Sequence, residues 1–236
     1  MLILLISLTC SEDDDAPTPE NPGNMPYDVQ INPDDFLSEN ITGNDFFPFT
    51  PGVTYKYEGT DEDGAEIIVE EIHLSDTKTI MGVTCVIIRA KEYEDGELIE
   101  DTYDWYAQDN EGNMWYFGED SKEIEDDVVV STSGSWEAGV DGALPGVIML
   151  EDPIVGLWYR QEYYADEAED VALVLSLNET VTVPFGTYNH CLQTAEWNLL
   201  EPGIVEHKYY AEDIGLVKVI AVKGESGYEE LTQIID

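Results

Sequence analysis

The chain of 236 residues carries 52 acidic and only nine basic residues, a formal net charge of −43. We therefore expect no nucleic-acid partner, because the phosphate backbone is bound by the Lys and Arg side chains that are scarce here. A hydrophobic content of 43% and an aromatic content of 11% exclude wholesale disorder. The acidic surface is typical of a protein kept soluble in salt, and the alternative is weak Ca²⁺ binding by clustered carboxylates.

An apolar run over residues 2–9 ends at Cys10 and is too short to cross a bilayer, which predicts a signal peptide over residues 1–9. The pattern resembles a bacterial lipoprotein signal, in which the cysteine becomes the acylated first residue. The acids after Cys10 resemble the surface-export tag of Bacteroidetes-type lipoproteins. These resemblances imply an exported outer-membrane or cell-surface lipoprotein tethered through Cys10. The alternative is an ordinary cleaved signal with an incidental cysteine.

Residues 10–45 are rich in Pro, Asn and acids, and their low hydrophobicity predicts an extended tether. We expect membrane contact through the lipid anchor alone, because an anionic membrane surface repels so acidic a chain. Residues 46–236 then form a single β domain.

Runs of β-branched and aromatic residues recur from Phe46 onward, separated by turn signals such as Asp63–Gly64 and Asp95–Gly96. A glycine-rich stretch, 133–156, predicts a long ordered loop, and 165–174 is the best place for a short helix. The predicted strands are 53–58, 65–74, 81–93, 97–108, 114–117, 128–131, 157–164, 172–183, 188–197, 205–211, 215–222 and 228–234.

About ten or more strands joined by hairpins predict an all-β fold, a mostly antiparallel meander forming a strongly curved sheet. A half-barrel, a closed barrel and a sandwich all satisfy this pattern.

Several long segments of the chain look familiar when read in order. They are EDTYDWYAQDNEGNMWYFGE (100–119), GSWEAGVDGA (134–143), YRQEYY (159–164) and KYYA (208–211). Together they resemble a widespread, uncharacterised family of secreted bacterial proteins and lipoproteins, over roughly residues 46–220. The resemblance implies secretion and a single β domain, and it supplies no activity, cofactor or catalytic residue.

Aromatic residues suggest a ligand-binding face. Strand geometry puts Asp104 and Tyr106 on one face and Trp105 on the other. On a concave face, Tyr106, Trp115 and Trp136 would stack against sugar rings or line an apolar pocket. The alternative is cross-strand aromatic packing that only stabilises the sheet.

Arg160 is one of only two arginines. On a strand it shares a face with Glu162, while Tyr159, Gln161 and Tyr163 share the opposite one. Its guanidinium would bind a carboxylate or sulfate of a ligand, and the alternative is a scaffold ion pair.

Catalytic candidates are weaker. Glu137 and Asp141 lie in the glycine-rich loop, where paired carboxylates would suit glycoside hydrolysis, although 52 acids make chance proximity common. His207 shares a strand face with Tyr209, an arrangement suited to proton abstraction or to a structural hydrogen bond. The histidines lack ligand spacing, so we expect no metal site and no cofactor. Cys85 and Cys191 form either a disulfide or two buried thiols.

The sequence thus favours a membrane-anchored binding lipoprotein with an aromatic-lined concave face. Its candidate ligand-binding residues are Tyr106, Trp115, Trp136, Glu137, Arg160 and Glu162. Its ligand would be a glycan, a lipid-like molecule or a partner protein. One alternative is a polysaccharide-active enzyme, a hydrolase or lyase, using Glu137, Glu162 or His207 beside Arg160. The other is a structural or assembly module.

Overall fold

The computed structural model describes residues 26–236, so the predicted signal peptide and Cys10 lie outside the described residues. Within them the chain forms strands and turns, with one 3₁₀ turn at Pro33–Asp35 and no α-helix. The predicted all-β, strongly curved antiparallel sheet is confirmed.

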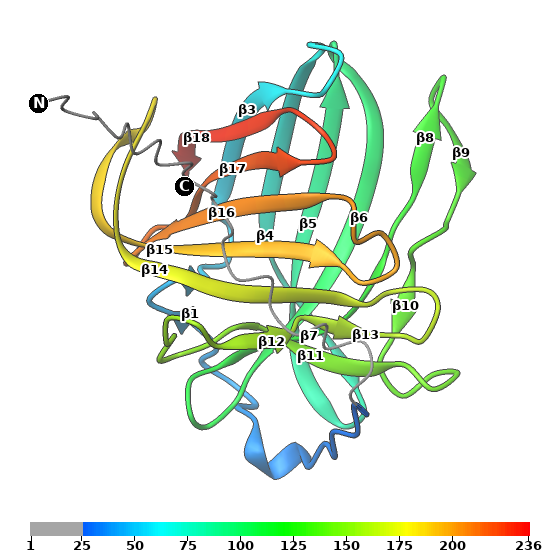
Figure 1. Ribbon diagram of the computed structural model, residues 1–236. Helices are drawn as coiled ribbons and strands as arrows, with labels where there is room; N and C mark the ends of the chain where they lie inside the picture. Colours follow the sequence, from blue (N-terminus) through cyan, green and yellow to red (C-terminus); the bar gives the residue numbers. More distant parts are fainter. Residues whose placement is uncertain (1–25) are drawn as a thin grey trace, which may run out of the picture.

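Most strands follow one another as antiparallel hairpins (Figure 1). The strands of the first half are β1 (Gly43–Asn44), β2 (Phe47–Pro48), β3 (Thr54–Thr60), β4 (Glu66–Ile80), β5 (Val83–Glu94), β6 (Glu97–Gln108), β7 (Met114–Asp120), β8 (Glu123–Glu125) and β9 (Val128–Ser131). Those of the second half are β10 (Trp136–Glu137), β11 (Leu144–Met149), β12 (Trp158–Arg160), β13 (Glu162–Tyr163), β14 (Asp170–Val183), β15 (Gly186–Asn198), β16 (Val205–Ala211), β17 (Gly215–Lys223) and β18 (Tyr228–Ile235).

The main sheet has the order β12-β14-β15-β16-β17-β18-β3-β4-β5-β6-β7-β11-β13. Its middle joins the last strand of the chain to an early one, because β18 pairs with β3. All of these pairings are antiparallel, as hairpin connections dictate.

The two ends of this order, β12 and β13, are separated in the chain by Gln161 alone, so the curved sheet nearly closes into a barrel. The Gln161 N–H donates to the Asp170 carbonyl at 2.9 Å, continuing the pairing with β14. One residue later, Glu162 pairs with Pro145 of β11. The chain therefore changes partner strand at Gln161, which splits the predicted strand 157–164 in two.

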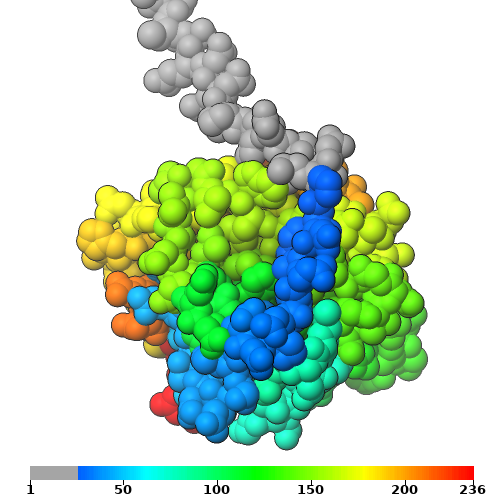
Figure 2. Space-filling model, turned by 90° about the horizontal axis from the view of Figure 1, so that it is seen from below, coloured from blue at the N-terminus to red at the C-terminus, as the bar shows by residue number. Residues whose placement is uncertain are grey.

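Residues 36–49 lie across one end of the barrel. The Leu37 N–H donates to the Gln108 carbonyl at 2.9 Å, and the Gln108 side chain donates to the Gly43 carbonyl at 2.7 Å. Phe49 is buried with Ile41 against barrel residues. Figure 2 shows the early residues, in blue, lying against the molecular surface. The described part of the predicted tether thus contacts the domain.

Two local predictions were wrong. The stretch 133–156 contains β10 and β11, because pairing with β7 supplies the hydrogen bonds that a loop lacks. No helix forms over 165–174, where a bridge between Tyr164 and Ala168 leads directly into β14.

Candidate functional site

The barrel interior contains a cavity of about 370 Å³ near the end opposite residues 36–49. It reaches solvent, because the exposed Glu201 forms part of its wall. Other wall residues come from β7, the β12–β13 junction and β14 to β16, namely Tyr116, Glu119, Gln161, Glu162, Asp170, Glu196, Trp197, Glu206 and Lys208. The wall is therefore rich in carboxyl groups, with one basic side chain and aromatic surface.

A bulge in β7 brings Glu119 to the interior. Asp104 pairs with Glu119 and Tyr106 pairs with Tyr116. Between these two pairs β7 has two residues and β6 has one, so β7 contains a β-bulge. Gly118 lies in the bulge with φ of +118°, and a Cβ there would collide with the Trp136 carbonyl oxygen. Glycine at this position thus allows Tyr116 and Glu119 to line one cavity.

Tyr116 joins two carboxyl groups. Its hydroxyl lies 2.7 Å from Oδ1 of Asp104 and 2.9 Å from Oε2 of Glu119. Burial raises the pKa of Glu119 to about 7, against the lowering effect of the hydrogen bond from Tyr116. Burial and the neighbouring Glu119 charge hold the pKa of Asp104 well above its usual value. Two such close carboxyl groups do not both ionise readily, so the pair retains a proton near neutral pH.

Glu162 lies on the adjoining wall. The Trp136 indole N–H donates to Oε2 of Glu162 at 2.9 Å. Burial raises the pKa of Glu162 well above its usual value, and a hydrogen bond to the Asp170 carboxyl raises it further. Edge-to-face contact between Trp136 and Tyr116, with centroids 5.5 Å apart, links this group to the Asp104–Glu119 pair.

The third part of the wall is an ion pair. Nζ of Lys208 lies 3.2 Å from Glu196 and 3.8 Å from Glu206. Burial alone would raise the pKa of Glu196, but the Lys208 charge and hydrogen bonds from Thr194 and Gln161 bring it below its usual value. Glu196 therefore favours the ionised form, whereas Glu162 and the Asp104–Glu119 pair favour the protonated form more than ordinary carboxyl groups do.

A second cavity of about 140 Å³ lies deeper, toward residues 36–49. It shares Ile148, Glu196 and Lys208 with the first cavity, and Phe46 and Phe47 line it from the N-terminal segment. Its wall is mainly aromatic and apolar, with Glu71 and Asp104 among the acids.

Three of the six predicted ligand-binding residues come together here. Tyr106 stacks on Tyr116 with centroids 5.0 Å apart, and Trp136 and Glu162 are hydrogen-bonded. Asp104 shares the interior face with Tyr106, as the alternation predicts. Whether these residues bind a ligand stays a prediction.

The other three predicted residues lie away from this cavity. The Trp115 indole donates to Asp109 at 2.8 Å and packs on Phe36. Glu137 forms an ion pair with Lys78 at 2.7 Å.

Arg160 points away from the cavity too, lying over the Tyr163 and Tyr27 rings with Glu169 at 3.6 Å. The expectation that it shares a face with Glu162 was wrong, because the change of partner strand at Gln161 breaks the alternation. Gln161 and Glu162 both line the cavity.

The remaining candidates are dispersed. Nδ1 of His207 contacts Gln193, which also donates to the Tyr209 hydroxyl at 3.0 Å, and Asp141 is exposed in a turn. The disulfide is not formed, since Cys85 and Cys191 are free thiols buried in separate core clusters.

Sequence reasoning missed Glu119, Asp170, Glu196 and Lys208. Alternation along β15 and β16 would have found the last two, since Thr194 and Glu196 face inward opposite Lys208 and Glu206. Among residues 26–236, no group of three or more His, Cys, Asp or Glu side chains is arranged to hold a metal ion. In the same part of the chain, no helix has the length and apolar character needed to span a membrane.

Comparison with known proteins gives no family for the chain. It matches no protein-family model and no curated protein sequence. It is similar in structure to a "putative exported protein with YmcC-like fold" from Bacteroides fragilis, with 14% identity and a TM-score of 0.49, over 82% of this chain and 100% of that one. A "putative lipoprotein" from Parabacteroides distasonis has 12% identity and a TM-score of 0.42, over 82% of this chain and 99% of that one.

Proposed function

We propose that this protein is an exported, lipid-anchored binding module that takes a polar, uncharged ligand such as a glycan unit into the mouth of its barrel. The observation that carries the binding proposal is the cavity of about 370 Å³, bounded by Tyr116, Gln161, Glu162 and Trp197. Its volume falls in the range of roughly 300–1,000 Å³ that is usual for small-molecule sites.

The chemistry of the wall supports a hydroxyl-rich ligand. Ionised Glu196 accepts hydrogen bonds, while a protonated Glu162 or Glu119 can also donate one. A sugar hydroxyl can do both, and its ring can lie on the aromatic surface of Tyr116 or Trp197. A fatty chain would leave these polar groups buried without partners, which is costly.

The anchoring proposal rests on the sequence at the N-terminus, where an apolar run precedes Cys10 and acids follow it. Metabolic labelling with a fatty acid tests it. We expect label on the wild-type protein and none on Cys10→Ser.

The binding proposal is tested by titrating neutral disaccharides, a uronic-acid disaccharide and a fatty acid while following tryptophan fluorescence. We expect saturable binding of at least one neutral disaccharide, weakened about tenfold by Gln161→Ala or Glu162→Ala through the loss of one hydrogen bond. Glu137→Ala is the matched control, because Glu137 pairs with Lys78 away from the cavity. Binding that is unaffected by the cavity variants, or preferential binding of the fatty acid, would contradict the proposal.

A second candidate function is hydrolysis of a glycan. The Asp104–Glu119 pair favours it, because a carboxyl group with a pKa of about 7 can exchange a proton at neutral pH. Release of reducing ends during the same titration, abolished in Glu119→Gln, would identify this activity. Binding without such release supports the binding module.

A further inference from the structure

The sheet is split between β6 and β8. These strands pair at Glu100 and Glu123, and the Asp101 N–H donates to the Lys122 carbonyl at 3.0 Å. Beyond this point β8 turns away with β9 as a hairpin arm that stands apart from the body (Figure 1). Among residues 26–236, no strand pairs with Glu97–Ile99 on the side away from β5.

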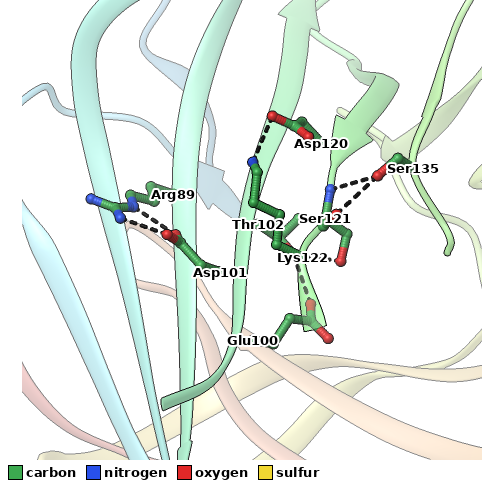
Figure 3. Close-up of polar contacts among 8 residues, drawn as sticks. All are labelled: Arg89, Glu100, Asp101, Thr102, Asp120, Ser121, Lys122 and Ser135. Atoms are coloured by element: carbon green, nitrogen blue, oxygen red, sulfur yellow. Dashed lines mark hydrogen bonds and ion pairs between the residues drawn. The ribbon is translucent and has the colours of Figure 1, made fainter. Parts of the chain in front are cut away.

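Polar contacts fix the base of this split (Figure 3). The buried Thr102 hydroxyl lies 2.7 Å from Oε1 of Glu100 and 3.0 Å from Oγ of the buried Ser121. The Ser121 N–H donates to Oγ of Ser135 at 2.9 Å, which in turn donates to the Ser121 carbonyl at 3.0 Å. These hydrogen bonds fix the residues at which β8 separates from β6, so the position of the split is defined by the structure.

The split encloses a groove of about 640 Å³. Leu98, Ile99 and Ile124 provide apolar surface, and acids including Glu97, Glu125 and Asp127 line the same groove. None of these residues lines either interior cavity, so the groove is independent of the site proposed above.

The strands along the groove offer backbone hydrogen bonds. On one wall Glu97 and Leu98 pair only with β5, and on the other Ile124 and Glu125 pair only with β9. In addition, Val128, Val129 and Val130 of the arm are 60, 49 and 51% exposed, a run of β-formers covered by no part of residues 26–236. Unpaired strand edges of this kind template the addition of another strand.

We propose that the split between β6 and β8 is a docking site for an extended strand of a partner protein in which apolar residues alternate with Lys or Arg. The open edges would supply main-chain hydrogen bonds, the apolar groove residues would receive alternate side chains, and the acids would pair with the basic ones. A second copy of this chain is disfavoured as the occupant, because each copy carries a formal charge of −43.

The test uses the full chain and a synthetic nine-residue peptide of alternating Lys and Val, followed by amide hydrogen exchange. We expect exchange at Glu97–Ile99 and Ile124–Glu125 to slow about tenfold or more at saturation, because these amides gain hydrogen bonds. The same peptide N-methylated at alternate residues keeps its charge but loses half of its strand donors, and it should give no such protection.

Two protein variants localise the effect. Ile124→Lys places a charge in the groove and should weaken peptide binding about tenfold, whereas Val222→Lys makes the same change of charge at an exposed valine of β17 and should not. Equal binding of the N-methylated peptide, protection elsewhere, or equal effects of the two variants would overturn the proposal. So would a dimer, detected by sedimentation, in which the same amides are protected without peptide.

Discussion

The two ends of the barrel interior differ in chemistry although the same strands build both. Along β15 the inward side chains run from Leu192, fully buried, through Thr194 to Glu196. Along β16 they run from Tyr210 to Lys208 and Glu206. Toward residues 36–49 the interior is mainly apolar and holds only the smaller cavity, and toward the mouth it is acidic and holds the larger one.

This difference suggests that the apolar end of the interior stabilises the fold and that the acidic end serves binding. Burial of apolar surface drives folding, and the end near residues 36–49 provides it. Buried carboxyl groups with raised pKa values oppose folding at neutral pH, because the fold disfavours their ionised form. A chain that retains them at one end of its core loses stability there and gains a polar cavity, as expected for a binding site.

The largest effect on stability is expected at Leu192, in the apolar end of the interior. Leu192→Ala removes a fully buried side chain that packs with Met114, Met149 and Val174, and it should lower the free energy of unfolding by about 2–5 kcal/mol. Glu162→Gln, at the acidic end, keeps an acceptor for the Trp136 indole and should cost less than about 1 kcal/mol. Denaturant unfolding at pH 7.5 measures both. Equal losses would mean that the acidic end contributes as much stability as the apolar end.

Sequence reasoning succeeded where local rules decide the structure. Tight turns at Asp63–Gly64 and Asp95–Gly96 and alternation along β6 depend on neighbours in the chain, and both were predictable. Residues 36–45 look like part of a tether by composition, yet a few apolar residues such as Phe36 and Ile41 pack against the barrel. Composition averages over a segment, whereas packing depends on single side chains.

The site was only partly predictable for a similar reason. Tyr106 and Glu162 lie on strands that the pattern predicts. The position of Glu119 in the cavity was not predictable from alternation. It is an odd number of residues from Tyr116, so strict alternation puts the two side chains on opposite faces of the sheet. The Gly118 bulge reverses that assignment, and a bulge is set by the pairing of distant strands. The partner change at Gln161 displaced Arg160 from the site in the same way.

Lys208 is the one Lys or Arg side chain among the residues that line the two interior cavities. Lys208→Met leaves Glu196 and Glu206 without their cation and should lower the free energy of unfolding by about 1–3 kcal/mol, less than for a fully buried pair because Lys208 is partly exposed. The double variant Lys208→Met/Glu196→Gln should regain part of that loss. A double-mutant cycle measures the coupling, and additive effects would show that Lys208 does not hold the acidic end together.

The smallest expected effect is a dependence of stability on pH. Burial raises the pKa values of Glu119 and Glu229 to about 7, against an ordinary value of 4.5. Between about pH 4.5 and 7 the folded chain therefore binds more protons than the unfolded chain, and stability falls as the pH rises through this window. The two partly exposed groups should together account for roughly 1–2 kcal/mol.

Thermal unfolding at fixed ionic strength from pH 5 to pH 8 measures this loss. Salt must be held constant, because screening of the net charge would alter stability by itself. Glu119→Gln should flatten the pH dependence, since an amide does not ionise, and Glu123→Gln on the exposed arm should leave it unchanged. A stability that rises with pH across this range would mean that Glu119 and Glu229 stabilise the fold in their ionised form. The acidic end would then contribute to stability as the apolar end does, and its carboxyl groups would no longer be evidence for a binding site.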